Sequence, residues 1–374
     1  MSSLLRFLRT YGRSDATDLD VTETCYNREG LELPATVYRP KTRKRLPGWV
    51  VLHGLTFTGR EHPSLVRFAR AVAAAGNVVF VPELPEWRAL RVAPGITHET
   101  IRSAVRALHD RDDTVPERQG LFGFSFGATQ ALIAAADPGV SSLLRMVAAW
   151  GGYSDVHRLF QFGITGEFDF DGKSWRVPPD PYGSWIMSGS YLTAIPGYEG
   201  HSDVAEAALA LAREAGRRRV YSRDASYDDV KRELRENIAP EHVAVFDLIA
   251  PLSTAGDIDL SYGRMMARKL ADAALSVDPM MDAQPFLGRV GTRVLLAHGR
   301  DDRLVPFTET LRTARALPPE RLAGTTITAL FAHSGGTNQR LGPVGKAREG
   351  VRFLGVLGRI LHSLEPRTLA GKPG

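Results

Sequence analysis

Short, almost wholly apolar runs alternate with helical patterns between residues 48 and 152. The runs 48–52 and 77–82 lie on either side of a helical pattern over 64–75, which ends at Gly76. Continuous apolar runs are typical of parallel strands that are buried on both faces of a sheet. Their alternation with helices predicts an α/β fold with a mostly parallel, doubly wound sheet. In such a sheet, functional side chains lie beyond the carboxyl ends of the strands.

The sequence Gly-Phe-Ser-Phe-Gly at 123–127 follows one such run and precedes a stretch of small helix formers, 128–136. A serine between two glycines at this junction predicts a sharp strand-to-helix turn, because a side chain on either neighbour would collide with the strand or the helix. The strained backbone of such a turn lifts the Ser125 hydroxyl clear of the sheet. Ser125 is therefore the candidate nucleophile, and a glycine-rich turn without chemistry is the alternative.

Two later strand patterns end in residues that suit the activation of a serine. The pattern over 292–297 leads into His-Gly-Arg-Asp-Asp-Arg-Leu-Val-Pro at 298–306, and the pattern over 325–331 leads to His333. A serine hydroxyl needs a base to take its proton as it attacks. Histidine suits this task because its ordinary pKa is about 6.5, and a carboxylate is needed to fix its tautomer.

A serine, an acid and a histidine in this order, each after a strand, resemble the catalytic triad of the α/β-hydrolase superfamily. The resemblance is to its esterase-like and lipase-like members, and it covers residues 20–152 and 285–362. It implies Ser125 as the nucleophile, Asp302 as the acid and His333 as the base. The fold that it implies is the same doubly wound sheet that the strand pattern predicts.

The acid has two alternatives in this sequence. The stretch around Asp302 is similar to the family's His-Gly-x-x-Asp-x-x-Val-Pro, and this spacing favours Asp302 over the adjacent Asp301. Asp155 is the second alternative, because some members of the family carry the acid after that earlier strand. His298 precedes the acid motif and is expected to be structural, bonding neighbouring backbone.

An acyl-transfer intermediate carries an oxyanion that needs two positioned N–H donors. The amide of Phe126 is expected to be the first, because it lies at the N-terminus of the helix after Ser125, where the helix dipole favours negative charge. By resemblance to the family's His-Gly-x motif, the amide of Leu55 supplies the second, with Thr56 as the alternative. His53 is expected to brace this loop. The glycine-rich variant of the motif, typical of the hormone-sensitive-lipase-like branch, is absent.

The strand pattern stops at 153, and a segment rich in aromatic residues is followed by helical patterns up to 280. The segment is predicted to be a mainly helical cap inserted between two core strands, with core parts at 20–152 and 281–365. A cap excludes water and gates access to the site. Three aromatic residues lie nearest a strand end and are expected to contact the substrate: Trp150, Tyr153 and Phe160.

The composition excludes several other classes of protein. The 374 residues carry a net charge of +5, from 47 basic and 42 acidic side chains, without the concentrated basic face that nucleic-acid binding needs. No metal-binding motif, phosphate loop or dinucleotide fingerprint occurs, so neither a metal nor a cofactor is expected. No apolar stretch reaches the length of about 18 residues that a transmembrane helix requires.

The N-terminal residues and the single cysteine bear on where the protein resides. Residues 1–10 lack the features of a signal peptide, and Leu4, Leu5, Phe7 and Leu8 would share one face of a short helix. This helix is expected to dock on the protein body, with a membrane surface as the alternative. Cys25 cannot form an intramolecular disulfide and is expected to be buried. A soluble, cytoplasmic protein is predicted, and homo-oligomers are compatible with the sequence.

The residues together predict a serine hydrolase that cleaves carboxylic esters of small molecules through an acyl-enzyme on Ser125. An acylpeptide hydrolase, an aminopeptidase-like enzyme and a carbon–carbon bond hydrolase use the same triad, and the sequence does not separate them from an esterase. A non-catalytic binding protein on this fold is the remaining alternative. Such proteins usually lack a triad member, whereas all three residue types are present here.

Overall fold

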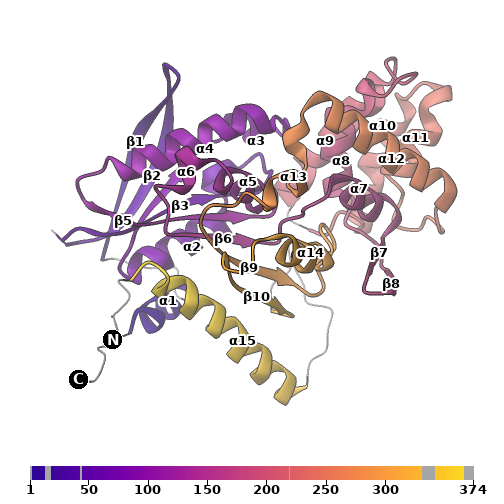
Figure 1. Ribbon diagram of the computed structural model, residues 1–374. Coiled ribbons are helices and arrows are strands. Elements are labelled where there is room, and N and C mark those ends of the chain that lie inside the picture. The colour runs from indigo at the N-terminus through magenta and orange to yellow at the C-terminus, as the bar shows by residue number, and fades with distance from the viewer. Residues whose placement is uncertain (1, 13–17, 43, 219, 331–341, 366–374) are drawn as a thin grey trace.

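The computed structural model describes residues 2–12, 18–42, 44–218, 220–330 and 342–365. At its centre lies an eight-stranded sheet with the strand order β1-β2-β4-β3-β5-β6-β9-β10 (Figure 1). Its strands are β1 (Leu19–Arg28), β2 (Leu31–Pro40), β3 (Leu46–Leu52), β4 (Val78–Pro82), β5 (Thr114–Phe124), β6 (Met146–Trp150), β9 (Arg293–Gly299) and β10 (Leu322–Thr328). β2 is antiparallel to both β1 and β4, and every neighbouring pair from β4 to β10 is parallel. The predicted mostly parallel α/β sheet is therefore confirmed.

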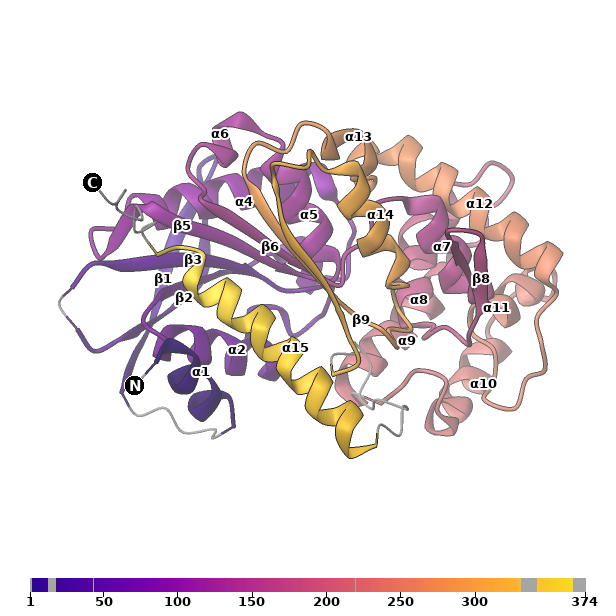
Figure 2. The same ribbon diagram turned by 60° about the horizontal axis from the view of Figure 1, so that its bottom comes forward.

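Helices cover both faces of this sheet (Figure 2). One apolar cluster joins the sheet to α1 (Ser3–Gly12), α2 (Pro63–Ala74) and α15 (Pro343–His362). A second cluster, on the opposite face, joins it to α4 (Pro94–His109) and α5 (Phe126–Ala135). Four shorter helices complete the core: α3 (Pro85–Arg88), α6 (Pro138–Ser141), α13 (Gln284–Leu287) and α14 (Thr308–Ala316). Two-sided cover explains why the central strands read as continuous apolar runs.

The N-terminal helix docks on the body, as the sequence predicts. Phe7 of α1 is buried, and its ring meets the edge of Phe68 at a centroid distance of 5.9 Å. The Arg6 side chain donates hydrogen bonds to the carbonyl oxygens of Ala74 and Ala75, at the end of α2. Arg6 thereby supplies donors to carbonyls that the end of a helix leaves without intrahelical partners.

Between β6 and β9 the chain leaves the sheet and forms a group of helices beyond one end of the strands (Figure 2). We call residues 153–280 the insertion. Its helices are α7 (Val156–Thr165), α8 (Tyr182–Tyr191), α9 (Ser202–Arg218), α10 (Asp228–Glu236), α11 (Val243–Ile249) and α12 (Leu260–Val277). Phe160, Trp185 and Tyr191 are buried in the same apolar cluster as α4 and α5. The apolar interior of the insertion is therefore continuous with the part of the core that contains α4 and α5.

The insertion also contains a β-hairpin that the sequence pattern did not predict. It pairs β7 (Glu167–Phe170) with β8 (Lys173–Arg176). Its turn residues Asp171 and Gly172 have φ of 51° and 73°, the left-handed pair that a two-residue hairpin turn requires. The signal in the sequence was Asp-Gly between runs that contain Phe168, Phe170 and Trp175.

Two further expectations are corrected. Cys25 is exposed, not buried, because side chains alternate between the faces of a strand and its neighbour Tyr26 takes the buried face of β1. The last strand covers Leu322–Thr328 rather than 325–331, and its register with β9 shifts between Leu322 and Gly324. No helix among the described residues is long and apolar enough to cross a membrane.

Candidate active site

Ser125 lies in a strained turn between β5 and α5. Its backbone has φ 55° and ψ −126°, a region that a residue with a side chain rarely adopts. The turn is closed by a hydrogen bond of 2.8 Å from the Ser125 amide to the Trp150 carbonyl at the end of β6. A Cβ on Gly123 would collide with the Gly127 carbonyl, and one on Gly127 with the His53 carbonyl. Glycines are therefore required on both sides of the serine.

The amide of Phe126 is the first backbone donor beside this serine. Phe126 is the first residue of α5, and the Ser125 carbonyl already accepts from Ala128 at 2.8 Å. The first amides of a helix have no intrahelical acceptor. Within the described part of the chain, neither the Phe126 amide nor the Leu55 amide has a hydrogen-bond acceptor. Both are therefore available to a negatively charged oxygen.

The loop after β3 lies directly beside Ser125. A Cβ on Gly54 would come within 3.1 Å of the Ser125 Cβ, so the missing side chain allows this close approach. His53 is buried, and its Nδ1 lies 2.6 Å from the Gly54 carbonyl oxygen. Burial lowers the pKa of His53 to about 4, so the ring is neutral near pH 7 and its Nδ1–H donates to that carbonyl. His53 thus occupies the bracing position that the sequence predicts for it.

The carboxylate of Asp302 is wholly buried beyond the end of β9. Its Oδ1 accepts hydrogen bonds from the amides of Leu304 at 2.9 Å and Val305 at 3.1 Å. Its Oδ2 lies 3.4 Å from the Nε2 of His298. His298 also contacts the Val305 carbonyl at 3.0 Å and the Thr310 hydroxyl at 2.7 Å. These contacts connect the acid loop to the end of β9 and to Thr310 of α14, and they give His298 the structural contacts expected of it.

The alternative acid, Asp155, makes contacts of a different kind. Its Oδ1 caps α7 by accepting from the Arg158 amide at 2.9 Å, and its Oδ2 pairs with the Arg158 guanidinium at 2.9 Å. Both carboxylate oxygens therefore serve the first turn of the insertion. Asp301 is half-buried beside Asp302.

His333 lies outside the described residues. The chain leads to it from β10, which is parallel to β9 with Thr328 opposite Gly299. Gly299 precedes Asp302 by three residues, so β10 ends at the same edge of the sheet as the acid loop. Since β5 and β3 also end at this edge, the described strands bring Ser125, Leu55 and Asp302 to one region.

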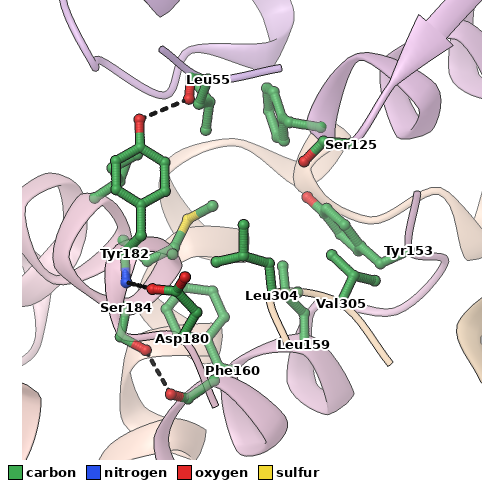
Figure 3. Close-up of a pocket in the computed structure, with 15 residues that line it drawn as sticks. Leu55, Ser125, Tyr153, Leu159, Phe160, Asp180, Tyr182, Ser184, Leu304 and Val305 are labelled. Atoms are coloured by element: carbon green, nitrogen blue, oxygen red, sulfur yellow. Dashed lines mark hydrogen bonds between the residues drawn. The ribbon is translucent and has the colours of Figure 1, made fainter. Parts of the chain in front are cut away.

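A cavity of about 640 Å³, including its open mouth, lies between this edge and the insertion (Figure 3). Ser125, Leu55 and Phe126 line it on the core side, and the lining also includes Tyr153 and Phe160, which the sequence analysis expects to contact the substrate. Sequence reasoning did not identify the remaining lining residues, most of which are apolar: Leu159, Gly163, Asp180, Tyr182, Gly183, Ser184, Ile186, Met187, Leu304 and Val305. An apolar cavity with a few polar groups is the usual form of a small-molecule site.

Trp150 does not belong to this lining, and the expectation for it is corrected. Its ring packs against Phe124 at a centroid distance of 6.2 Å and against Phe353 of α15 at 5.7 Å. These side chains belong to the cluster on the opposite face of the sheet from α5. No group of three or more metal-ligating side chains is found in the described ranges.

A buried carboxylate joins the insertion to the core near the cavity. Glu309 of α14 accepts hydrogen bonds from the amide and the hydroxyl of Ser154, at 3.0 and 2.9 Å, and from the Asp155 amide at 3.2 Å. The Arg158 guanidinium pairs with it at 2.6 Å. Because the Glu309 side chain is only 1% exposed, its charge depends on these partners. They fix the start of α7 against the acid-loop side of the core.

No protein-family model and no curated protein matches the sequence of this chain. Solved structures do match it. Esterase Est22 is 13% identical with a TM-score of 0.50, over 92% of this chain and 81% of that chain. The acylaminoacyl peptidase of Pyrococcus horikoshii is also 13% identical with a TM-score of 0.50, over 96% of this chain and 44% of that one. Brefeldin A esterase is 16% identical with a TM-score of 0.47, over 97% of this chain and 86% of that chain. At these identities the likeness concerns the fold.

Proposed function

From the α/β-hydrolase fold of this chain, we propose that it is a serine hydrolase that cleaves carboxylic esters of small molecules. The observation that carries the proposal is the position of Ser125, on a strained turn at the wall of an apolar cavity. Strained backbone conformations cluster at functional sites. Esterase Est22, one of the structures with a similar fold, supports the same class of reaction.

In the proposed reaction, the Ser125 hydroxyl oxygen attacks the ester carbonyl carbon while His333 takes its proton. The amides of Leu55 and Phe126 donate hydrogen bonds to the oxyanion of the tetrahedral intermediate. Collapse breaks the bond to the alcohol, which leaves with the proton from His333. Water then attacks the acyl-enzyme with His333 as base, releasing the acid and restoring Ser125. Asp302 orients His333 and stabilises its protonated form.

The insertion, residues 153–280, acts as the cap in this proposal. Its side chains Leu159, Phe160, Ile186 and Met187 supply much of the apolar wall opposite Ser125. Such a wall excludes water and favours an apolar acyl or alcohol group of modest size. The insertion also covers Ser125 from the side opposite the core, which favours a small molecule over a polymer bound along an open cleft. The substrate is therefore proposed to be a small ester.

Labelling with a fluorophosphonate probe tests the proposal most directly. We expect the wild-type protein to be labelled once, at Ser125, and Ser125→Ala to lose both labelling and ester hydrolysis. Ser190→Ala is the matched control, because Ser190 lies on α8 outside the cavity lining and its hydroxyl donates to the Ile186 carbonyl of its own helix. Equal labelling of wild type and Ser125→Ala would refute a Ser125 nucleophile.

A substrate panel tests the ester specificity. We expect p-nitrophenyl esters to be hydrolysed much faster than aminoacyl p-nitroanilides, with His333→Ala inactive on both. Faster cleavage of the anilides would replace the esterase proposal by a peptidase. Labelled protein that turns over no ester in a chain-length series would also overturn the esterase proposal.

A further inference from the structure

The loop that carries Leu55 is held by two side chains from different parts of the molecule. The first is His53, whose Nδ1–H donates to the Gly54 carbonyl at 2.6 Å. That carbonyl and the Leu55 amide belong to one peptide unit, and the described chain contains no cis peptide bond. In a trans peptide unit the C=O and N–H bonds lie in one plane and point in opposite directions. By holding the Gly54 carbonyl on one side, His53 directs the Leu55 N–H to the other.

The second side chain is Tyr182, the first residue of α8 in the insertion. Its hydroxyl donates a hydrogen bond of 2.9 Å to the Leu55 carbonyl (Figure 3). This carbonyl belongs to the next peptide unit, so the two hydrogen bonds hold the units before and after the Leu55 α-carbon. The soft dihedrals of Leu55 lie between these two units. Holding both units therefore restricts the direction of the Leu55 amide more than either bond alone.

Tyr182 is itself well placed to serve as a fixed anchor. Its amide donates to the Asp180 carboxylate at 3.1 Å, which sets the start of α8. Burial raises the pKa of the Tyr182 hydroxyl well above its usual value, so the group stays protonated and remains a donor at any working pH. Tyr182 also lines the cavity, so it touches the space that the substrate would fill.

We propose that Tyr182 is a positioning residue which, through the Leu55 carbonyl, holds the Leu55 amide in the geometry that binds the oxyanion. This inference rests on the proposed function of the site. In it, the oxyanion hole belongs jointly to the core, which supplies the amides and His53, and to the insertion, which supplies Tyr182. The insertion then contributes to the rate of the reaction as well as to the choice of substrate.

The alternative is that Tyr182 merely attaches the insertion to the core. The same helix offers a matched control at its other end. Tyr191 is buried, and its hydroxyl donates to the Val92 carbonyl of the core at 3.4 Å. Tyr191 does not line the cavity, and Val92 is not part of the loop at 53–56. If the two tyrosines were only attachments, their phenylalanine variants would behave alike.

The experiment compares Tyr182→Phe and Tyr191→Phe in the full chain with one p-nitrophenyl ester. We expect Tyr182→Phe to lower kcat about tenfold with KM within about twofold, because the loss is confined to the transition state. Loss of an oxyanion donor itself costs about 10²–10³-fold, so a loosened donor should cost less. Affinity for a trifluoromethyl ketone, which forms an oxyanion with Ser125, should fall by a similar factor. Tyr191→Phe should leave kcat, KM and this affinity unchanged.

Equal kcat and inhibitor affinity for the two variants would overturn the inference. A rise in KM without a fall in kcat would overturn it as well, because it would assign Tyr182 to ground-state binding. Thermal unfolding of both variants shows that the assays are made on folded protein. If the wild type neither hydrolyses esters nor labels at Ser125, the proposed function fails instead, and the two failures are thereby distinguished.

Discussion

The turn that carries Ser125 and the insertion opposite it are held by different parts of the chain. At the turn, backbone packs on backbone: Cβ atoms on Gly123 and Gly127 would collide with carbonyl groups, and every residue of α5 is buried. At the β7–β8 hairpin of the insertion, charged side chains make attachments. The β7–β8 hairpin is held by pairs such as Arg264–Glu167, Arg312–Asp169 and Arg315–Asp171.

This difference decides which contacts tolerate substitution and which do not. The side chains of Arg315 and Asp171 are 59% and 54% exposed, and water and salt screen an exposed pair of this kind, so it contributes little to stability. Such a pair can be exchanged at little cost. A backbone contact at Gly123 offers no such exchange, because any added atom displaces a carbonyl group or the helix. The turn that carries Ser125 is therefore fixed by backbone contacts, whereas the exposed ion pairs of the β7–β8 hairpin can be replaced.

The largest effect is expected from the addition of one carbon atom at the turn. In Gly123→Ala, the new Cβ would collide with the Gly127 carbonyl and with the backbone of Ala128. We expect a loss of about 3 kcal/mol in the free energy of unfolding, from overpacking. Activity should fall about 100-fold, because Ser125 would be displaced. Urea unfolding and ester kinetics measure the two effects.

Gly355→Ala is the control for this change. Gly355 lies in α15 with open space around its Cβ position, so alanine should stabilise the helix by up to about 1 kcal/mol. A Gly123→Ala protein as stable and active as Gly355→Ala would show that the turn is not rigid.

The buried side chain of His53, beside the turn, predicts that the stability of the protein depends on pH. The pKa of His53 is lowered to about 4 in the folded protein, whereas an unfolded histidine titrates near about 6.5. As pH falls below about 6.5, the unfolded chain takes up a proton at His53 that the folded chain does not, so stability falls. The contribution of the neutral, buried His53 to the free energy of unfolding is complete above about pH 6.5, and about 2 kcal/mol of it should be lost by pH 5.

His53→Gln, which does not titrate, isolates this effect. Urea unfolding at pH 7.5 and pH 5 should show a smaller loss of stability in the variant than in the wild type, by about 2 kcal/mol. The opposite trend from Asp282, whose pKa burial raises to about 6, is common to both proteins and cancels in the comparison. The same pH dependence in both proteins would contradict the assignment of a neutral, buried His53.

The smallest effect is expected from a larger side chain at Gly183, on the insertion side of the cavity. A Cβ on Gly183 would meet Leu304 at 3.6 Å, an ordinary contact, and both residues line the cavity. Gly183→Val should therefore fold and narrow the cavity. We expect kcat/KM for a long-chain p-nitrophenyl ester to fall about tenfold, with the acetate ester unchanged. Gly183→Ala should show a smaller loss of the same kind, and equal losses for all chain lengths would refute the cavity as the acyl or alcohol site.

The features that could be predicted from the sequence depend on local rules. Apolar runs of strand length, glycines around Ser125 and the Asp-Gly turn at 171–172 each require a particular backbone, whatever lies nearby. The sheet and the strained turn were therefore predictable from the sequence. The hairpin carries a signal of the same local kind in its Asp-Gly turn. The acid motif similarly led to Asp302, which lies at the sheet edge that also carries Ser125 and Leu55.

The wall of the cavity was not predictable in the same way, and Trp150 shows why. Successive side chains of a strand point to opposite faces, so proximity to a strand end does not say which face a residue takes. The ring of Trp150 joins Phe122 and Phe124 on the face away from the cavity. Tyr153, beyond the end of that strand, reaches the cavity instead.

The α/β sheet and the strained turn at Ser125 follow from the amino-acid sequence, because both depend on backbone requirements within a few consecutive residues. Which insertion side chains meet that serine, and which of them holds the neighbouring loop, depends on the folded molecule. Tyr182 and Leu55 are 127 residues apart in the chain, and no periodicity or spacing links them. Their hydrogen bond exists because the insertion folds back over the sheet edge, which depends on the packing of the whole molecule.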